Sequence, residues 1–145
     1  MATFLAHLTV RPGEEAHFEE AAAELHRATL EEEPGCLRYE YWRGEDERTY
    51  YTLGSFSDAR AFLTHQMSEH HTVVGRRLMS ILESFRLEWI EPIDGLAPLP
   101  ATVQLPLRDE AEAREAEFYA RFPVAEPAWW RAPRAPSEGT ADSAD

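Results

Sequence analysis

Four short runs of this chain alternate apolar and polar residues, and two longer stretches between them have the apolar spacing of helices. In the first run, the even-numbered positions from 4 to 10 are all apolar, which is typical of a strand with one buried face. The predicted segments are a strand Phe4–Arg11, a helix to about Glu32, strands Leu37–Trp42 and Arg48–Phe56, a helical stretch Ser57–Ser84 and a strand Phe85–Ile90.

Turn residues separate these segments. Pro12-Gly13 and Pro34-Gly35 flank the first helix, and Gly44–Glu47 is a polar hairpin loop. The order β-α-β-β-α-β predicts an α+β fold of the ferredoxin-like, split β-α-β type with a four-stranded antiparallel sheet. Helices then cover one sheet face only, so we expect a homodimer, a dimeric α/β barrel, to cover the other.

The helices have identifiable faces and ends. The first has a predicted buried stripe of Phe18, Ala21, Ala22, Leu25 and Thr29. Glu31-Glu32-Glu33 at its end is interpreted as a solvated face. Ser57 is the expected N-cap of the second helical stretch, which we expect to break near Ser68.

The middle hairpin is rich in aromatic residues. Its first strand, Leu37–Trp42, is predicted to place on one face Leu37, Tyr39 and Tyr41, with Trp42 on the other. In its other strand, Arg48–Phe56, we expect one face to carry Tyr51 and Leu53. The opposite face is expected to carry Tyr50 and Phe56.

The texture changes after Pro92, so we assign residues 1–92 to one domain, 93–136 to a proline-rich extension and 137–145 to a disordered tail. The extension contains a predicted helix, Arg108–Phe122, with an aromatic end, followed by Trp129-Trp130. Exposed aromatic residues in such number are unfavourable. We therefore expect the segment to pack on the body or on the other subunit and to roof part of the pocket.

Charge and composition exclude several functions. A net charge of −13 argues against nucleic acid and anionic membranes as partners, and no run is long enough to span a bilayer. There is no recognisable leader and only one cysteine, Cys36, so we expect a cytoplasmic protein. The chain has no lysine for Schiff-base chemistry and no glycine-rich loop for NAD or a tightly bound flavin.

Four motifs resemble those of the antibiotic biosynthesis monooxygenase (ABM) family. They are Thr9–Gly13 before an acidic helix, Glu33–Leu37, Phe56–Ala59 with Phe62, and Ser68-Glu69-His70-His71. The resemblance covers about residues 2–92 and implies the same ferredoxin-like fold. The superfamily includes cofactor-free quinone-forming oxygenases, haem-degrading enzymes, isomerases and members without known activity, so the fold alone does not select a reaction.

The resemblance implies a cofactor-free monooxygenase that uses O₂ to oxidise a polycyclic phenol or anthrone to a quinone in aromatic polyketide metabolism. The alternatives are a non-oxidative cyclase or isomerase with a histidine base, and a non-catalytic binding protein. The asparagine and tryptophan of the best-known pocket are absent, since the chain has no asparagine and Phe56 stands where the tryptophan is usual. A histidine is therefore the expected base, because imidazole titrates near neutral pH.

The candidate catalytic residues are His70, His7 and His71. The candidate substrate-binding residues are Tyr39, Tyr41, Tyr51, Phe56, His65, Arg86 and Trp89. Each also has a purely structural interpretation: a strand histidine for His7, a helix cap for His70 and His71, sheet core for the aromatic residues, and a pair with Glu40 or Glu88 for Arg86.

We expect no metal and no cofactor. His65, His70, His71 and Glu69 lie close in sequence, but their spacing is not a tight metal signature. In the haem-degrading branch the proximal histidine would fall at about Gly75, where this chain has no imidazole.

Overall fold

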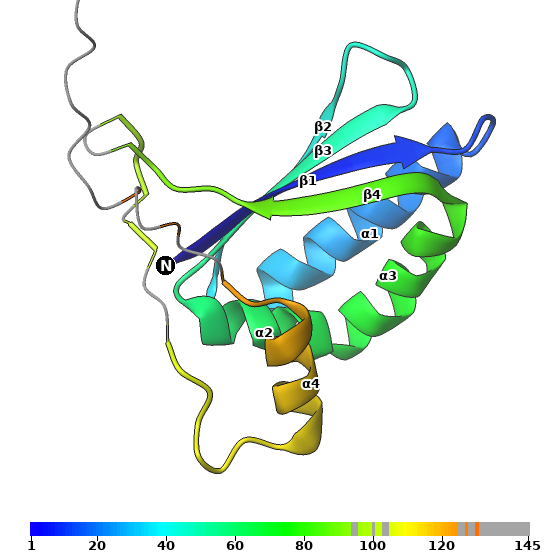
Figure 1. The fold of residues 1–145 in the computed structure, drawn as a ribbon. Helices are drawn as coiled ribbons and strands as arrows, with labels where there is room; N and C mark the ends of the chain where they lie inside the picture. The colour runs from blue at the N-terminus through cyan, green and yellow to red at the C-terminus, as the bar shows by residue number, and fades with distance from the viewer. Residues whose placement is uncertain (94–95, 100, 103–104, 125–126, 128–129, 131–145) are drawn as a thin grey trace, which may run out of the picture.

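The computed structural model of the protein describes residues 1–93, 96–99, 101–102, 105–124, 127 and 130 (Figure 1). Its elements are β1 (Ala2–Val10), α1 (Glu15–Glu32), β2 (Cys36–Arg43), β3 (Thr49–Phe56), α2 (Ala59–Met67), α3 (Glu69–Ile81), β4 (Leu82–Trp89) and α4 (Ala113–Arg121). The predicted β-α-β-β-α-β order is confirmed, with the second helical stretch divided into α2 and α3.

The four strands form one antiparallel sheet in the order β2-β3-β1-β4. The outer strands β2 and β4 each follow a helix, which is the split β-α-β arrangement predicted from the sequence. Figure 1 shows α1 and α3 on the same side of this sheet. No helix in the described part of the chain has both the length and the apolar character needed to cross a bilayer.

The two faces of the sheet differ, because successive side chains of a strand point in opposite directions. On β1, Phe4 and Ala6 are buried beneath the helices, whereas Leu5 and His7 lie on the open face and are partly exposed. Phe4 pairs with Gly54 on β3, and a Cβ at position 54 would lie 2.3 Å from the Phe4 ring. Glycine at position 54 therefore leaves the space that the Phe4 ring occupies in the core.

The core lies between the sheet and α1, α2 and α3. The predicted stripe of α1 is confirmed: the residues buried on that helix are Phe18, Ala21, Ala22, Leu25 and Thr29. On α2, Phe62 is fully buried and its ring lies 5.8 Å from that of Phe56 on β3. These contacts attach α1 and α2 firmly to the same sheet face.

The start of α2 differs from expectation by one residue. Asp58, not Ser57, is the N-cap, and its carboxylate accepts a hydrogen bond from the backbone N–H of Ala61 at 2.8 Å. The backbone of Ser57 is instead bonded to the Gly35 carbonyl at 2.8 Å, which keeps that residue outside the helix. The predicted break at Ser68 is confirmed, since Ser68 ends α2 and its Oγ caps α3.

The faces of the middle hairpin are partly as predicted. Tyr39 and Tyr41 face the helices, and Trp42 lies on the other side with 56% of its surface exposed. Leu37 does not share the face of the two tyrosines. The register between β2 and β3 shifts between Cys36 and Arg38, so Leu37 is displaced and 47% exposed.

The C-terminal extension packs on the body of the same chain. Its helix α4 lies beside α2 and is shorter than the predicted Arg108–Phe122 (Figure 1). The Phe122 ring lies 5.5 Å from that of Phe62, and Trp89 Nε1 donates a hydrogen bond to the Pro123 carbonyl at 2.9 Å. Trp129 and the predicted tail 137–145 lie outside the described residues.

These contacts predict that the extension contributes to stability. Phe122→Ala removes a ring packed on Phe62 and is expected to cost about 1–2 kcal/mol, which corresponds to a fall in melting temperature of about 3–8 °C. The matched control is Leu96→Ala, because Leu96 is 78% exposed. Differential scanning calorimetry measures both variants, and an unchanged melting temperature for Phe122→Ala would contradict the packing.

Candidate functional site

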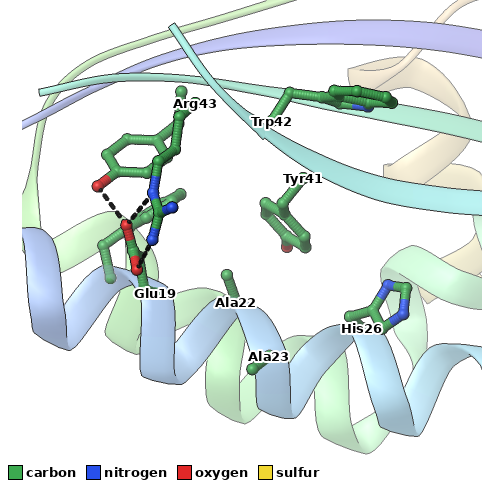
Figure 2. Close-up of a pocket in the computed structure, with 9 residues that line it drawn as sticks. Glu19, Ala22, Ala23, His26, Tyr41, Trp42 and Arg43 are labelled. Carbon is green, nitrogen blue, oxygen red and sulfur yellow. Dashed lines mark hydrogen bonds and ion pairs between the residues drawn. The ribbon is translucent and has the colours of Figure 1, made fainter. Parts of the chain in front are cut away.

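A pocket of about 510 Å³ lies between α1 and the neighbouring strands β2 and β3 (Figure 2), and we call it the α1–β2 pocket. Its lining residues are Phe18, Glu19, Ala22, Ala23, His26, Tyr41, Trp42, Arg43 and Tyr50. The α1 residues recur every three or four positions and so share one helix face. Ala22 and Ala23 are short, which leaves room above the helix where Tyr41 projects from the sheet.

One end of the α1–β2 pocket is charged. The Arg43 guanidinium donates two hydrogen bonds to the Glu19 carboxylate, at 2.7 and 2.6 Å, and the Tyr50 hydroxyl donates a third at 3.0 Å (Figure 2). The hydrogen bond from Arg43 is the main reason that the pKa of Glu19 is lowered. This end therefore presents a fixed, paired carboxylate and guanidinium beside the aromatic wall.

The other end holds His26, which the sequence analysis did not single out. His26 Nδ1 lies 2.6 Å from the backbone carbonyl oxygen of Tyr39. A carbonyl only accepts hydrogen bonds, so Nδ1 carries the proton and Nε2 keeps the lone pair in the neutral ring. Among the described residues nothing bonds to Nε2, so the imidazole is arranged as a proton acceptor. Its spacing from Glu19 and Ala22 on α1 was the available sequence signal.

Tyr41, which lines the α1–β2 pocket, contacts a second buried tyrosine, Tyr39, behind it. The Tyr41 hydroxyl donates to that of Tyr39 at 3.4 Å, and the Tyr39 ring lies 4.9 Å from the ring of His65. Burial raises the pKa of Tyr41 to about 12, and burial likewise raises that of Tyr39. Both hydroxyls therefore stay protonated at neutral pH and connect the pocket to a cluster of histidines behind it.

That cluster is centred on Glu33, and we call Glu33, His65 and His70 the Glu33 cluster. His65 Nδ1 lies 2.9 Å from Glu33 Oε1, and His70 Nε2 lies 2.5 Å from the same oxygen. The Glu33 side chain is only 8% exposed and that of His65 is fully buried. Burial raises the pKa of Glu33, but hydrogen bonds and positive charge from the two histidines outweigh burial and lower it.

The acidic run Glu31–Glu33 at the end of α1 was interpreted from the sequence as a solvated face, but its last residue points into the protein. Glu32 is 66% exposed, but Glu33 turns inward. Glu33 is the C-cap of α1, and its extended backbone redirects the side chain away from the helix surface. The break at Ser68 supplies its partners, because it places His65 in the last turn of α2 and His70 in the first turn of α3.

His71 lies beside the Glu33 cluster without bonding to Glu33. Its ring makes an edge contact with that of His65, with 4.4 Å between centroids. Burial, helped by the neighbouring charges of His65 and His70, lowers the pKa of His71 to about 3. His71 is therefore neutral under ordinary conditions and is a weak base.

The structure places the predicted site residues on two different faces of the sheet. The open face carries His7, Arg86 and Tyr51: His7 Nε2 lies 2.7 Å from Glu88 Oε1 and 2.8 Å from an Arg86 nitrogen, and its ring lies 5.4 Å from that of Tyr51. The helix face carries the others, namely Tyr39, Tyr41, Phe56, His65, His70, His71 and Trp89. The sheet separates the two groups, so they do not form one pocket.

Of the residues that line the α1–β2 pocket, Tyr41 is the one that the sequence predicted to bind substrate. The C-terminal extension was expected to roof part of the pocket, but none of its described residues lines the α1–β2 pocket. Helix α4 instead lies over α2 and reaches the start of α3, where Arg114 donates to Thr72 Oγ1 at 3.1 Å. The extension is held there by aromatic contacts with α2, such as that between Phe122 and Phe62.

Solved structures with the same fold come from several organisms. A crystal structure from Caulobacter crescentus that is named an antibiotic biosynthesis monooxygenase has a TM-score of 0.61 and 23% identity, covering 64% of this chain and 90% of its own. A Pseudomonas aeruginosa protein has a TM-score of 0.58 and 25% identity, covering 63% and 93%. A Mycobacterium tuberculosis protein has a TM-score of 0.60 and 16% identity, covering 66% and 98%.

A search of curated proteins finds no match for this chain. The family model described as antibiotic biosynthesis monooxygenase matches residues 1–76, more than half of the 145 residues. Together with the fold, this match supports a general role as a small-molecule monooxygenase or binding protein. The chain belongs to the antibiotic biosynthesis monooxygenase family.

Proposed function

We propose that the protein binds a polycyclic phenol or anthrone in the α1–β2 pocket and oxidises it to a quinone with O₂, without a cofactor, in aromatic polyketide metabolism. The pocket volume of about 510 Å³ is typical of small-molecule sites. Phe18 and Tyr41 supply aromatic surface for a flat ring system. The Glu19–Arg43 pair and His26 supply polar groups at opposite ends of the pocket (Figure 2).

The observation that carries this proposal is the hydrogen bond from His26 Nδ1 to the Tyr39 carbonyl, which leaves Nε2 free to accept a proton. Oxidation of an anthrone starts by removal of a proton from the carbon opposite its carbonyl, and a positioned imidazole is suited to this step. His70, His7 and His71 remain candidate bases from the sequence. We propose His26 in their place because it lines the pocket.

The proposed reaction balances without an added reductant. His26 takes the ring proton, and the resulting carbanion transfers one electron to O₂. The two radicals then combine to a peroxide on the same carbon. Loss of the remaining hydrogen on that carbon and cleavage of the O–O bond give the second carbonyl and hydroxide, which becomes water with the proton from His26. Two hydrogens of the substrate and one oxygen atom leave as water, and the other oxygen atom enters the quinone.

The test uses the full chain with anthrone as the probe. We expect enzyme-dependent O₂ uptake and formation of anthraquinone in equal amounts, at a rate unaffected by prior treatment with EDTA and by added flavin. Turnover of aromatic substrates without O₂ uptake would instead indicate the cyclase or isomerase alternative. Binding of anthrone without any turnover would indicate a binding protein, and either result would overturn the oxygenase proposal.

We also propose that the protein acts as a homodimer through the open sheet face. Cross-strand pairs show that this face carries Leu5 beside Leu53, and Tyr51 beside Trp42. Light scattering at micromolar concentration is expected to give twice the chain mass of 16.6 kDa. Leu53→Arg should give the monomer mass, whereas the control Leu30→Arg, at an exposed position of α1, should leave the dimer intact. A monomeric wild-type protein would contradict this proposal.

A further inference from the structure

The Glu33 cluster brings together three side chains of the kinds that bind metal ions. One ligand atom from each of Glu33, His65 and His70 lies within 4.8 Å of the other two. The residues come from the C-cap of α1, the last turn of α2 and the first turn of α3. The fold therefore gathers them from three elements, and this is why the spacing along the chain carries no metal signature.

The donor set fits a borderline divalent cation of the zinc class. Zn²⁺ is bound by imidazole nitrogen and carboxylate oxygen at about 2.0–2.2 Å, usually with four ligands in a tetrahedron. Ligands at that distance are about 3.4 Å apart, as follows from tetrahedral geometry. The Glu33 oxygen lies 2.9 Å from the His65 nitrogen and 2.5 Å from the His70 nitrogen. Shifts of less than about 1 Å would therefore open the cluster enough for the ion.

A second carboxylate stands behind one of the proposed ligands. Glu32 Oε2 lies 3.5 Å from His70 Nδ1, while His70 Nε2 faces Glu33. Histidines that bind metals usually donate their other N–H to a carboxylate, which fixes the ring and strengthens the ligand. His70 is 14% exposed and Glu32 is 66% exposed, so an ion can reach the cluster from this side.

We propose that Glu33, His65 and His70 bind one zinc-class divalent cation, with Glu32 as the outer partner of His70. The ion replaces the two protons that the histidines share with Glu33, and it leaves a fourth position for water. It would tie the end of α1 to the α2–α3 break. The proposal does not depend on the α1–β2 pocket or on the oxygenase reaction.

The test is calorimetric titration of the full, EDTA-treated and dialysed protein with ZnCl₂. We expect one ion per chain, proton release that varies with buffer ionisation, and a higher melting temperature with zinc. Glu33→Gln and His70→Gln should weaken binding by at least about 100-fold, and Glu32→Gln by about 10-fold. The control is His17→Gln, because His17 is an exposed histidine on α1 paired with Glu14, and this variant should bind zinc like the wild type.

Circular dichroism shows which variants fold, and the exposed position of Glu32 makes Glu32→Gln informative even if both cluster variants unfold. Visible absorption of the Co²⁺-loaded protein adds a direct sign of tetrahedral coordination, which Glu33→Gln should abolish. Failure of the wild type to bind zinc would overturn the proposal. Equal zinc affinity of the wild type and the folded variants would overturn it too, because binding would then lie elsewhere on the chain.

Discussion

Replacing His26 with glutamine is expected to lower the turnover of anthrone by on the order of 10²-fold, with little change in melting temperature. A glutamine amide can still donate to the Tyr39 carbonyl, so the hydrogen bond that holds α1 to β2 is retained. It cannot accept a proton at neutral pH, so the base is lost. The measurements are initial rates of O₂ uptake and the unfolding curve of each variant.

The three histidines selected from the sequence provide the matched controls. His7 lies on the open face, and His70 and His71 lie in or beside the Glu33 cluster. We expect glutamine at each of these positions to preserve most of the anthrone turnover. A loss of turnover in His70→Gln or His7→Gln, with His26→Gln fully active, would show that the base is the sequence-based candidate and not His26.

The second large effect is a loss of stability in acid. His71 has a pKa of about 3 in the folded protein, whereas a histidine in the unfolded chain has its ordinary pKa of 6.5. Between these values the unfolded chain binds the additional proton, so the free energy of unfolding decreases as the pH falls from about 6.5 towards 3. Glu33 acts in the same direction below the ordinary glutamate pKa of 4.5, because its pKa is lowered in the folded state.

Each pKa unit corresponds to about 1.4 kcal/mol, and since the His71 ring is partly exposed we expect a loss of about 2 kcal/mol between pH 6.5 and 4.5. Urea unfolding at both pH values, with EDTA present, measures this slope. His71→Gln should flatten it, and the exposed His17→Gln should not. Equal slopes for the wild type and His71→Gln would show that His71 is not the group responsible.

The sequence was sufficient to predict how the elements follow one another. Two Pro-Gly turns, the α1 stripe and the even-numbered apolar positions of β1 depend on local geometry, which a linear pattern reports directly. The break at Ser68 and the closeness of the nearby histidines were predictable for the same reason, because a serine cap is a local feature. The family motifs lie in these same segments.

Tertiary structure decided which side chains meet. Glu33 and His70 are separated by 37 positions in the sequence. The backbone of Glu33 is extended where α1 ends, and this turns its side chain from solvent into the interior. His26 becomes a pocket residue only because the edge strand β2 lies across α1 and offers the Tyr39 carbonyl. Strand register sends Tyr39 and Tyr41 to the helices but Tyr51 to the open face. Contacts of this kind depend on how separate elements pack, and periodicity within each element carries no information about them.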